Sequence, residues 1–305
     1  MRGLGGFDSI AIRRTGSVVD VSLRHMTHFD FTEIRMLHAD HALAVRHERA
    51  AMTIEADYAR AHAALDPTSG IVVARVADGS AVFAGVGSPM TQATGLGMEG
   101  PITDADIEAL EAVFFAGGSP AKVVVCPHAD ESLLLTLGRR GYRPVEFENV
   151  MVRNLDERDD AMPTGSIDLR AVGRDEGDRF AEAVGVNFSE DGTLPPEMRA
   201  MMMAVFAVPD TTCVLATIDG QDAGGGTLLI HKGLAMLAGA GTLAEFRNRG
   251  VHTAVFAERL RLARRAGCDL AVMGCKPGSA SQRNAERKGF RVAYTKVVVE
   301  RQRPG

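Results

Sequence analysis

One pattern occurs twice in the chain, and this repeat limits the fold more than any other feature. Around Pro127 the sequence reads KVVVCPHADESLLLTLGRRGYRPVEFENVMVRNL, and around Pro277 it reads LAVMGCKPGSASQRNAERKGFRVAYTKVVVERQ. Each copy has a β-rich apolar run, a proline, a short helical stretch, a Gly-aromatic-Arg triplet and a second strand. Because the copies stand about 150 residues apart, the sequence predicts duplication of one α/β unit.

A polar segment separates the two halves. It runs from Arg153 to Ser166 and combines charge, proline and glycine between two apolar runs, as is typical of a linker. The chain of 305 residues also exceeds the usual domain size of ~100–200 residues. We therefore predict two domains, residues 1–158 and 159–305.

The hydrophobic periodicity predicts an α/β (α+β) fold in both halves. In the second half we expect strands at 167–173, 211–231, 234–243 and 268–275, and helices at 175–188, 195–208 and 251–267. In the first half we expect a long helix at 33–64, a hairpin at 70–87 and a helix at 103–115.

Composition excludes several classes of protein. A net charge of −5 argues against a nucleic-acid partner, which requires a basic face. No apolar run reaches the ~18 residues of a membrane span, and the first residues lack a signal-peptide core. The four cysteines are scattered, as in reduced cytoplasmic proteins, and we expect a cytoplasmic location.

The segment RNRGVHT, residues 247–253, precedes an amphipathic helix. Phe256, Leu260 and Ala263 form its apolar stripe, and we expect Arg261, Arg264 and Arg265 on the solvated side. The first N–H groups of a helix lack partners and its dipole is positive there, so an anion is favoured at residues 248–253. The alternative is an ordinary solvated turn.

Two other kinds of phosphate-binding loop are alternatives to this segment. The nucleoside-triphosphate pattern G-x-x-x-x-G-K-[ST] does not occur in the chain. Residues 239–244 match the dinucleotide fingerprint G-x-G-x-x-[GA], which requires a helix that begins at its glycines. Gly250 would then lie inside that helix, at a cost of ~1 kcal/mol, so this alternative is disfavoured.

The strand, loop and helix around Gly250, followed by SQRNAERKGF, resemble the GNAT superfamily of N-acetyltransferases. Residues 247–252 match the first four positions of its [QR]-x-x-G-x-[GA] signature, and about 140 residues share the order of elements. The resemblance implies two tandem domains, each with a mixed, mostly antiparallel sheet flanked by helices. It also implies acetyl-coenzyme A as co-substrate, with amides from Asn248 to Thr253 on its diphosphate.

The resemblance assigns further residues to coenzyme binding, with two departures from the family pattern. His252 replaces the final small residue of the signature, and Ala285 replaces the tyrosine that protonates the thiolate in many relatives, which leaves Tyr294 as the nearest substitute. The base stays open, with Glu245 and His231 near in sequence. The coenzyme-binding residues that the resemblance implies are Ala240, Gly241, Thr242, Arg247, Asn248, Arg249, Gly250, Val251, His252, Thr253, Ser281 and Asn284.

The first half is interpreted as a degenerate copy. Its Gln92–Gly97 segment satisfies the signature formally, but Gly100 and Pro101 interrupt the following helix, whose better N-cap is Thr103 or Asp104. A metal site is not expected, although histidines gather near the start of the first half: His25, His28, His38, His41 and His47.

The function predicted from this resemblance is transfer of an acetyl group to the amine of a small molecule or peptide. The alternative is a coenzyme A-binding sensor or scaffold without turnover, and the interpretation leaves a homodimer open.

Overall fold

The computed structural model describes residues 13–14, 17–18, 39–162, 166–188 and 192–304. Residues 1–36 and 37–305 form two separate units. The described part of the first is a short antiparallel pair, β1 (Arg13–Arg14) and β2 (Ser17–Val18).

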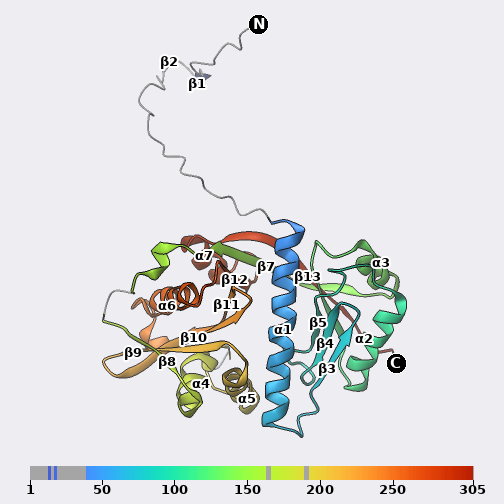
Figure 1. Cartoon of the computed structure of the whole chain (residues 1–305), viewed down its shortest axis with the longest axis horizontal. Coiled ribbons are helices and arrows are strands. Elements are labelled where there is room, and N and C mark those ends of the chain that lie inside the picture. The colour runs from blue at the N-terminus through green and yellow to red at the C-terminus, as the bar shows by residue number, and fades with distance from the viewer. Residues whose placement is uncertain (1–12, 15–16, 19–38, 163–165, 189–191, 305) are drawn as a thin grey trace. The chain divides into compact units, whose positions relative to one another are not determined.

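In the described part of the second unit, eleven strands form one sheet (Figure 1). Its order is β3-β4-β5-β6-β13-β7-β12-β11-β10-β9-β8. Pairing is antiparallel except between β5 and β6 and between β11 and β12. The strands are β3 (Val72–Val76), β4 (Gly79–Phe83), β5 (Gln92–Thr94), β6 (Ala121–Val125), β7 (Arg143–Asn154), β8 (Asp168–Val172), β9 (Thr211–Ile218), β10 (Gln221–His231), β11 (Leu234–Thr242), β12 (Leu270–Cys275) and β13 (Arg291–Arg301).

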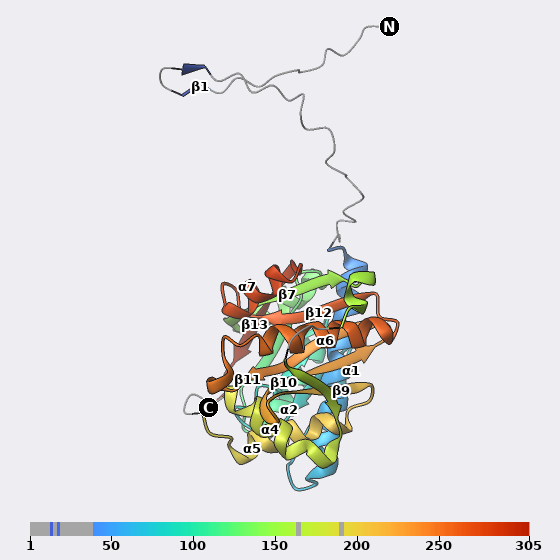
Figure 2. The same cartoon turned by 90° about the vertical axis from the view of Figure 1, so that its left-hand side faces the viewer.

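Helices cover both faces of this sheet (Figures 1 and 2). One face carries α1 (His41–Leu65), α4 (Gly177–Gly185) and α5 (Pro196–Ala204), and the other carries α2 (Asp104–Ala116), α3 (Glu131–Arg139), α6 (Val251–Arg265) and α7 (Ala280–Arg287). Alternation along β13 illustrates the two layers, because Tyr294 packs under α1 whereas Val299 packs against α3 on the opposite face.

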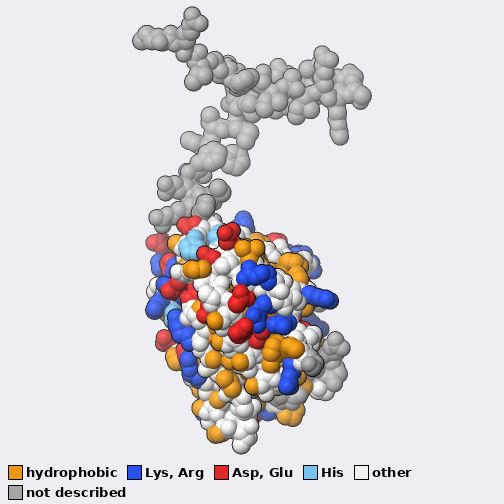
Figure 3. Space-filling view, turned by 90° about the vertical axis from the view of Figure 1, so that its right-hand side faces the viewer, with side chains coloured by type: hydrophobic (Ala, Val, Ile, Leu, Met, Phe, Trp, Pro, Cys, Tyr) orange, Lys and Arg blue, Asp and Glu red, His pale blue; other side chains and the backbone are white. Residues whose placement is uncertain are grey.

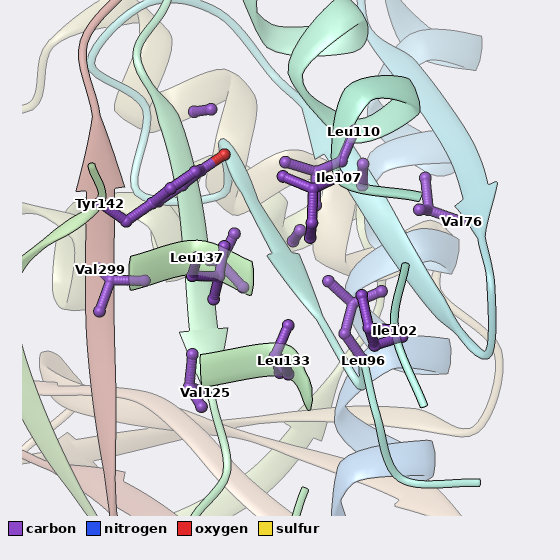
Figure 4. Packing of buried hydrophobic residues seen from close by; sticks show 14 of the residues in the cluster. Val76, Leu96, Ile102, Ile107, Leu110, Val125, Leu133, Leu137, Tyr142 and Val299 are labelled. Carbon is purple, nitrogen blue, oxygen red and sulfur yellow. The ribbon is translucent and has the colours of Figure 1, made fainter. Parts of the chain in front are cut away.

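The last strand of each repeat lies in the sheet of the other repeat. β7, from the first repeat, pairs with β12, and β13, from the second, pairs with β6. β7 and β13 also pair with each other at the centre. Val299 of β13 accordingly completes the core of the first half, together with Leu137 and Tyr142 (Figure 4). Neither half has a complete sheet without the other.

Most elements lie where the sequence predicts them, and the repeated segment forms β6-α3-β7 and β12-α7-β13. The long helix begins later than expected, because Asp40 caps it by accepting from the N–H of Leu43. Residues 33–38 of that prediction lie outside the described residues. The domain boundary at 158 and 159 stays a prediction.

One expectation about α6 is wrong. Arg261 is 7% exposed and forms an ion pair with Glu258, instead of lying on a solvated face. The reason is that residues 157–160, which lie outside the sheet, also contact α6, so the helix is covered on more than the side that faces the sheet.

The outer face of the first half, around α2 and α3, carries acidic and basic side chains intermixed (Figure 3). Arg140 of α3 forms ion pairs with Glu108 and Glu111 of α2, and Arg301 of β13 also reaches Glu111. The ion pair between Arg301 and Glu111 connects β13 to the first half. None of the described helices is both long enough and apolar enough to cross a membrane.

Candidate functional site

β11 and β12 stop pairing partway along their length, and we refer to the unpaired stretch between them as the cleft. Their parallel pairing begins at Leu234–Leu270 and ends at Met236–Val272, although both strands continue. Beyond this point Ala238 on β11 and Gly274 on β12 are exposed, even though both strands lie inside the sheet. The backbone groups on the facing edges are therefore free to pair with an extended ligand.

A bulge in β11 directs the strand away from β12. The register with β10 passes from Thr227–Ala238 to Gly225–Gly241, so three steps along β11 match two along β10. Gly239 lies in the bulge with φ of +46°, a conformation that favours glycine.

Arg259 of α6 donates hydrogen bonds to the backbone at this bulge. Its Nη1 donates to the carbonyl oxygens of Thr227 and Ala238, each at 3.2 Å. The side chain is 2% exposed, and burial lowers its pKa to about 10. Among the described residues no carboxylate pairs with this guanidinium, and the carbonyl oxygens of Thr227, Ala238 and Val255 accept its hydrogen bonds instead.

The loop between β11 and α6 presents unpaired amides. Asn248 and Gly250 both have left-handed backbones, with φ of +61° and +86°, a feature of loops that turn successive N–H groups to one side. Within the described chain, the N–H groups of residues 248–253 donate to no protein acceptor, and α6 has no side-chain cap. This is the arrangement predicted for an anion site at residues 248–253.

The loop is also basic. Arg247 and Arg249 are exposed, and Arg249 lies over the ring of Phe246 with 4.0 Å between its Nη2 and Asp219 Oδ2. A hollow of about 510 Å³ adjoins the loop, and its lining includes Gly250 and Thr253.

The end of β11 fits a ligand in the cleft. Ala240 and Thr242 are half-buried, and Thr242 Oγ1 has no hydrogen-bond partner in the described chain although the atom is buried. Gly241 is packed so closely that a Cβ there would overlap the side chain of Asn187 from the segment after α4. This buried hydroxyl can still pair with a polar group of a ligand.

The remaining predicted coenzyme residues lie around this loop and on α7. Val251 is buried in the core with its N–H unpaired, and burial lowers the pKa of the half-buried His252. Ser281 is exposed on α7, whose cap is Ser279 instead, and the half-buried Asn284 accepts from Arg287 at 3.4 Å.

The corresponding loop of the first half is already occupied by a carboxylate. Asp78, in the turn between β3 and β4, accepts from the N–H of Gly97 at 2.9 Å and from that of Glu99 at 2.7 Å. α2 then begins at Asp104 with Thr103 as its cap, as predicted. The N–H group of Gly97, which matches that of His252 in the repeat, is therefore paired within the protein, whereas the N–H groups of residues 248–253 are unpaired within the described chain.

We expect Asp78→Ala to lower the free energy of unfolding by about 1–3 kcal/mol, because two amides lose their acceptor. Coenzyme binding by the second half should not change. Urea unfolding and calorimetric titration measure the two effects; an unchanged stability would contradict the pairing.

A buried polar cluster lies between α1 and the central strands. Tyr294 of β13 donates to Glu48 Oε1 at 2.8 Å, and its hydroxyl lies 2.8 Å from His47 Nδ1. Lys296 Nζ lies 4.0 Å from Glu48 Oε1 and 3.4 Å from Glu148 Oε2. Burial raises the pKa of Glu48, but Lys296 and the hydrogen bonds outweigh it and lower the value to about 2. The histidines His25, His28 and His38 lie outside the described residues.

The sequence did not indicate that Glu48 and Glu148 lie together between α1 and the central strands. His231 ends β10 at its turn into β11, at the opposite end of β11 from the cleft, and Glu245 is exposed in the turn after β11. Glu148 comes from the first half and reaches the cleft through the exchange of β7. The sequence did contain one signal for this site, a difference between the two copies of the repeat: the first copy has Val124 where the second has Gly274.

The dinucleotide alternative fails on the same geometry. After Gly241 the chain remains in β11 to Thr242, and α6 begins only at Val251. A dinucleotide fingerprint needs its helix to begin at the glycines.

Comparison with known proteins shows which solved structures share this architecture. No family model and no curated protein matches the chain in sequence. Among solved structures, a GCN5-related N-acetyltransferase from Kribbella flavida is 18% identical, with a TM-score of 0.61 over 86% of this chain and 96% of that one. A tandem GNAT protein from the clavulanic acid biosynthesis pathway is 14% identical, with a TM-score of 0.52 over 65% and 69% of the two chains. A functionally unknown conserved protein from Staphylococcus epidermidis is 12% identical, with a TM-score of 0.53 over 76% and 93%.

These likenesses identify the fold. The chain has the fold of the GNAT superfamily, with a large, mostly antiparallel sheet flanked by helices, as the sequence predicted.

Proposed function

We propose that this protein transfers an acetyl group from acetyl-coenzyme A to the amine of an acceptor, and that the second half carries the site. The observation that supports this most is the set of unpaired amides at residues 248–253 next to the cleft between β11 and β12. Such amides, with the dipole of a helix of 15 residues behind them, suit the diphosphate of the coenzyme.

Each part of the site then has a role. Residues 248–253 hold the diphosphate, with charge from Arg247 and Arg249, and the free edge of β11 from Ala240 to Thr242 holds the pantetheine arm. Ser281 and Asn284 face the coenzyme from α7 in this proposal. Acetyl-coenzyme A supplies the thioester, and a backbone N–H of β11 near the bulge is placed to donate to the developing oxyanion.

We infer that the first half is non-catalytic, because Asp78 occupies the amides of its loop. The four cysteines are buried free thiols, which suits the reducing cytoplasm.

The proposal is tested by calorimetric titration with acetyl-coenzyme A and by thiol release with a panel of amines. Binding together with amine-dependent thiol release is the expected result. Binding without release from any acceptor would instead support a coenzyme sensor, and no binding would refute both.

Tyr294 is proposed as the proton donor to the thiolate, since Ala285 is buried in α7 and has no polar group. Burial raises the pKa of Tyr294 well above its ordinary value, and Glu48 raises it further, so the hydroxyl is protonated at neutral pH but is a weaker acid than a free tyrosine. We expect Tyr294→Phe to lower thiol release at least tenfold with unchanged coenzyme affinity, and to cost about 1–3 kcal/mol of stability because Glu48 loses a donor. Loss of stability with full activity would leave Tyr294 only the role of holding Glu48.

A further inference from the structure

The two repeats differ at one position that decides what lies at the mouth of the cleft. Val124 and Gly274 each stand three residues before the proline of their repeat. Val124 is 3% exposed in β6, whereas Gly274 is exposed in β12, two residues beyond the last pair with β11. The half with unpaired loop amides therefore also lacks a side chain at this point.

The carboxylate of Glu148 occupies the space that Gly274 leaves. Glu148 is on the neighbouring strand β7, and a Cβ built on Gly274 would overlap its Oε1, with its Cδ at 2.9 Å. A side chain at 274 would therefore displace the carboxylate. On β7, Glu148 alternates with Asn149, which bonds Gln282 of α7, so Glu148 lies on the α1 face.

Glu148 is the accessible member of an acidic group. Its side chain is 36% exposed, compared with 6% for Lys296 and 1% for Glu48, which lie behind it. Glu55, two turns after Glu48 on α1, adds a third carboxylate, hydrogen-bonded to Gln92 and Thr94. The three carboxylates, of Glu48, Glu55 and Glu148, thus all interact with the one ammonium group of Lys296.

This group of carboxylates can accept more hydrogen bonds than the described chain donates to it. Glu48 Oε2 is buried and, in the described chain, has no hydrogen-bond partner. Burial raises the pKa of Glu55 to about 7, and the charges of Glu48 and Glu148 add to this to a lesser extent. An ammonium group would supply the donors and positive charge that this face lacks.

We propose that Glu148 receives the acceptor, which is a cationic primary amine bound on the α1 face at the mouth of the cleft. This inference rests on the proposed function. The ammonium loses a proton to the Glu148 carboxylate, which passes it to water. The freed nitrogen pair forms a C–N bond to the thioester carbonyl carbon, and the C–S bond breaks with its electron pair left on sulfur. The nitrogen loses a second proton and the thiolate gains one, so the products are the acetamide, coenzyme A thiol and one released proton.

The test compares three variants with the wild type. Glu148→Gln removes the base with little change of shape, and Gly274→Val introduces the residue of the first repeat and displaces the carboxylate. Glu146→Gln is the control, since Glu146 lies two residues away on β7 and is paired with Lys276 at 3.6 Å. Thiol release is measured with 1,4-diaminobutane, tyramine and a lysine-containing peptide, and with 1,4-butanediol as a neutral counterpart. Coenzyme A affinity and thermal unfolding are measured in parallel.

We expect thiol release with an amine but not with the diol. Glu148→Gln should lower kcat/KM about 100-fold or more, the size expected for loss of a general base, with coenzyme A affinity within twofold of the wild type. Gly274→Val should act in the same direction, and Glu146→Gln should stay within threefold.

Three results would overturn the inference. Activity of Glu148→Gln within threefold of the wild type, or an equal loss in Glu146→Gln, would do so and leave the proposed function intact. Binding of coenzyme A without thiol release from any of the amines would also exclude a cationic amine acceptor. Failure of the wild type to bind coenzyme A would refute the proposed function itself.

Discussion

Gly250→Asp is expected to weaken acetyl-coenzyme A binding at least 100-fold, a loss of about 2.7 kcal/mol of binding free energy. The new carboxylate would stand beside the amides of residues 248–253 and repel the diphosphate. It would also compete for those amides, as Asp78 does for the N–H groups of Gly97 and Glu99 in the first half. Calorimetric titration gives the affinity directly.

The fold should survive this change. A Cβ at position 250 would meet only the side chain of Ile167, at 3.8 Å, and aspartate tolerates the left-handed backbone better than most residues. Gly118→Asp is the matched control, because Gly118 has φ of +74° and nothing within 4 Å of a built Cβ. Equal affinity of Gly250→Asp and Gly118→Asp would remove the loop from the coenzyme site.

Separating the two halves should abolish folding of each. If the chain is cut after Met162, the first fragment keeps β7 without β12 and the second keeps β13 without β6, so each exposes a long unpaired strand. The first core also loses Val299, and Glu111 loses its ion pair with Arg301. We expect neither fragment alone to unfold cooperatively, and we expect the two to form a 1:1 complex when expressed together.

Circular dichroism during thermal unfolding and size-exclusion chromatography measure these outcomes. The intact chain, and the intact chain with a protease site introduced after Met162 and cleaved once folded, are the controls; the cleaved form should remain associated. A fragment of residues 163–305 that unfolds cooperatively by itself, near the melting temperature of the full chain, would contradict the strand exchange.

The sequence predicted the elements well because their signals are local. The stripe of Phe256, Leu260 and Ala263 defines α6, and Thr103 begins α2 as a capping residue should. The loop before α6 could be identified for the same reason, since unpaired amides at a helix start follow from the sequence order alone.

The features missed depend on contacts between distant segments. The exchange of β7 and β13 cannot be read from strand patterns, because either pairing buries the same apolar faces. Glu148 reaches the cleft only through that exchange, and Asp78 reaches its amides only through the turn between β3 and β4. Arg261 was misplaced because periodicity shows which side of a helix is apolar, not how much of it other elements cover.

In the proposed function, the backbone at residues 248–253 binds the diphosphate of coenzyme A. A crystal structure of the protein with coenzyme A tests it most directly. We expect diphosphate oxygens within hydrogen-bond distance of the N–H groups of this loop, with the pantetheine arm between β11 and β12. A diphosphate bound elsewhere, with these N–H groups paired to protein carbonyls, would contradict it.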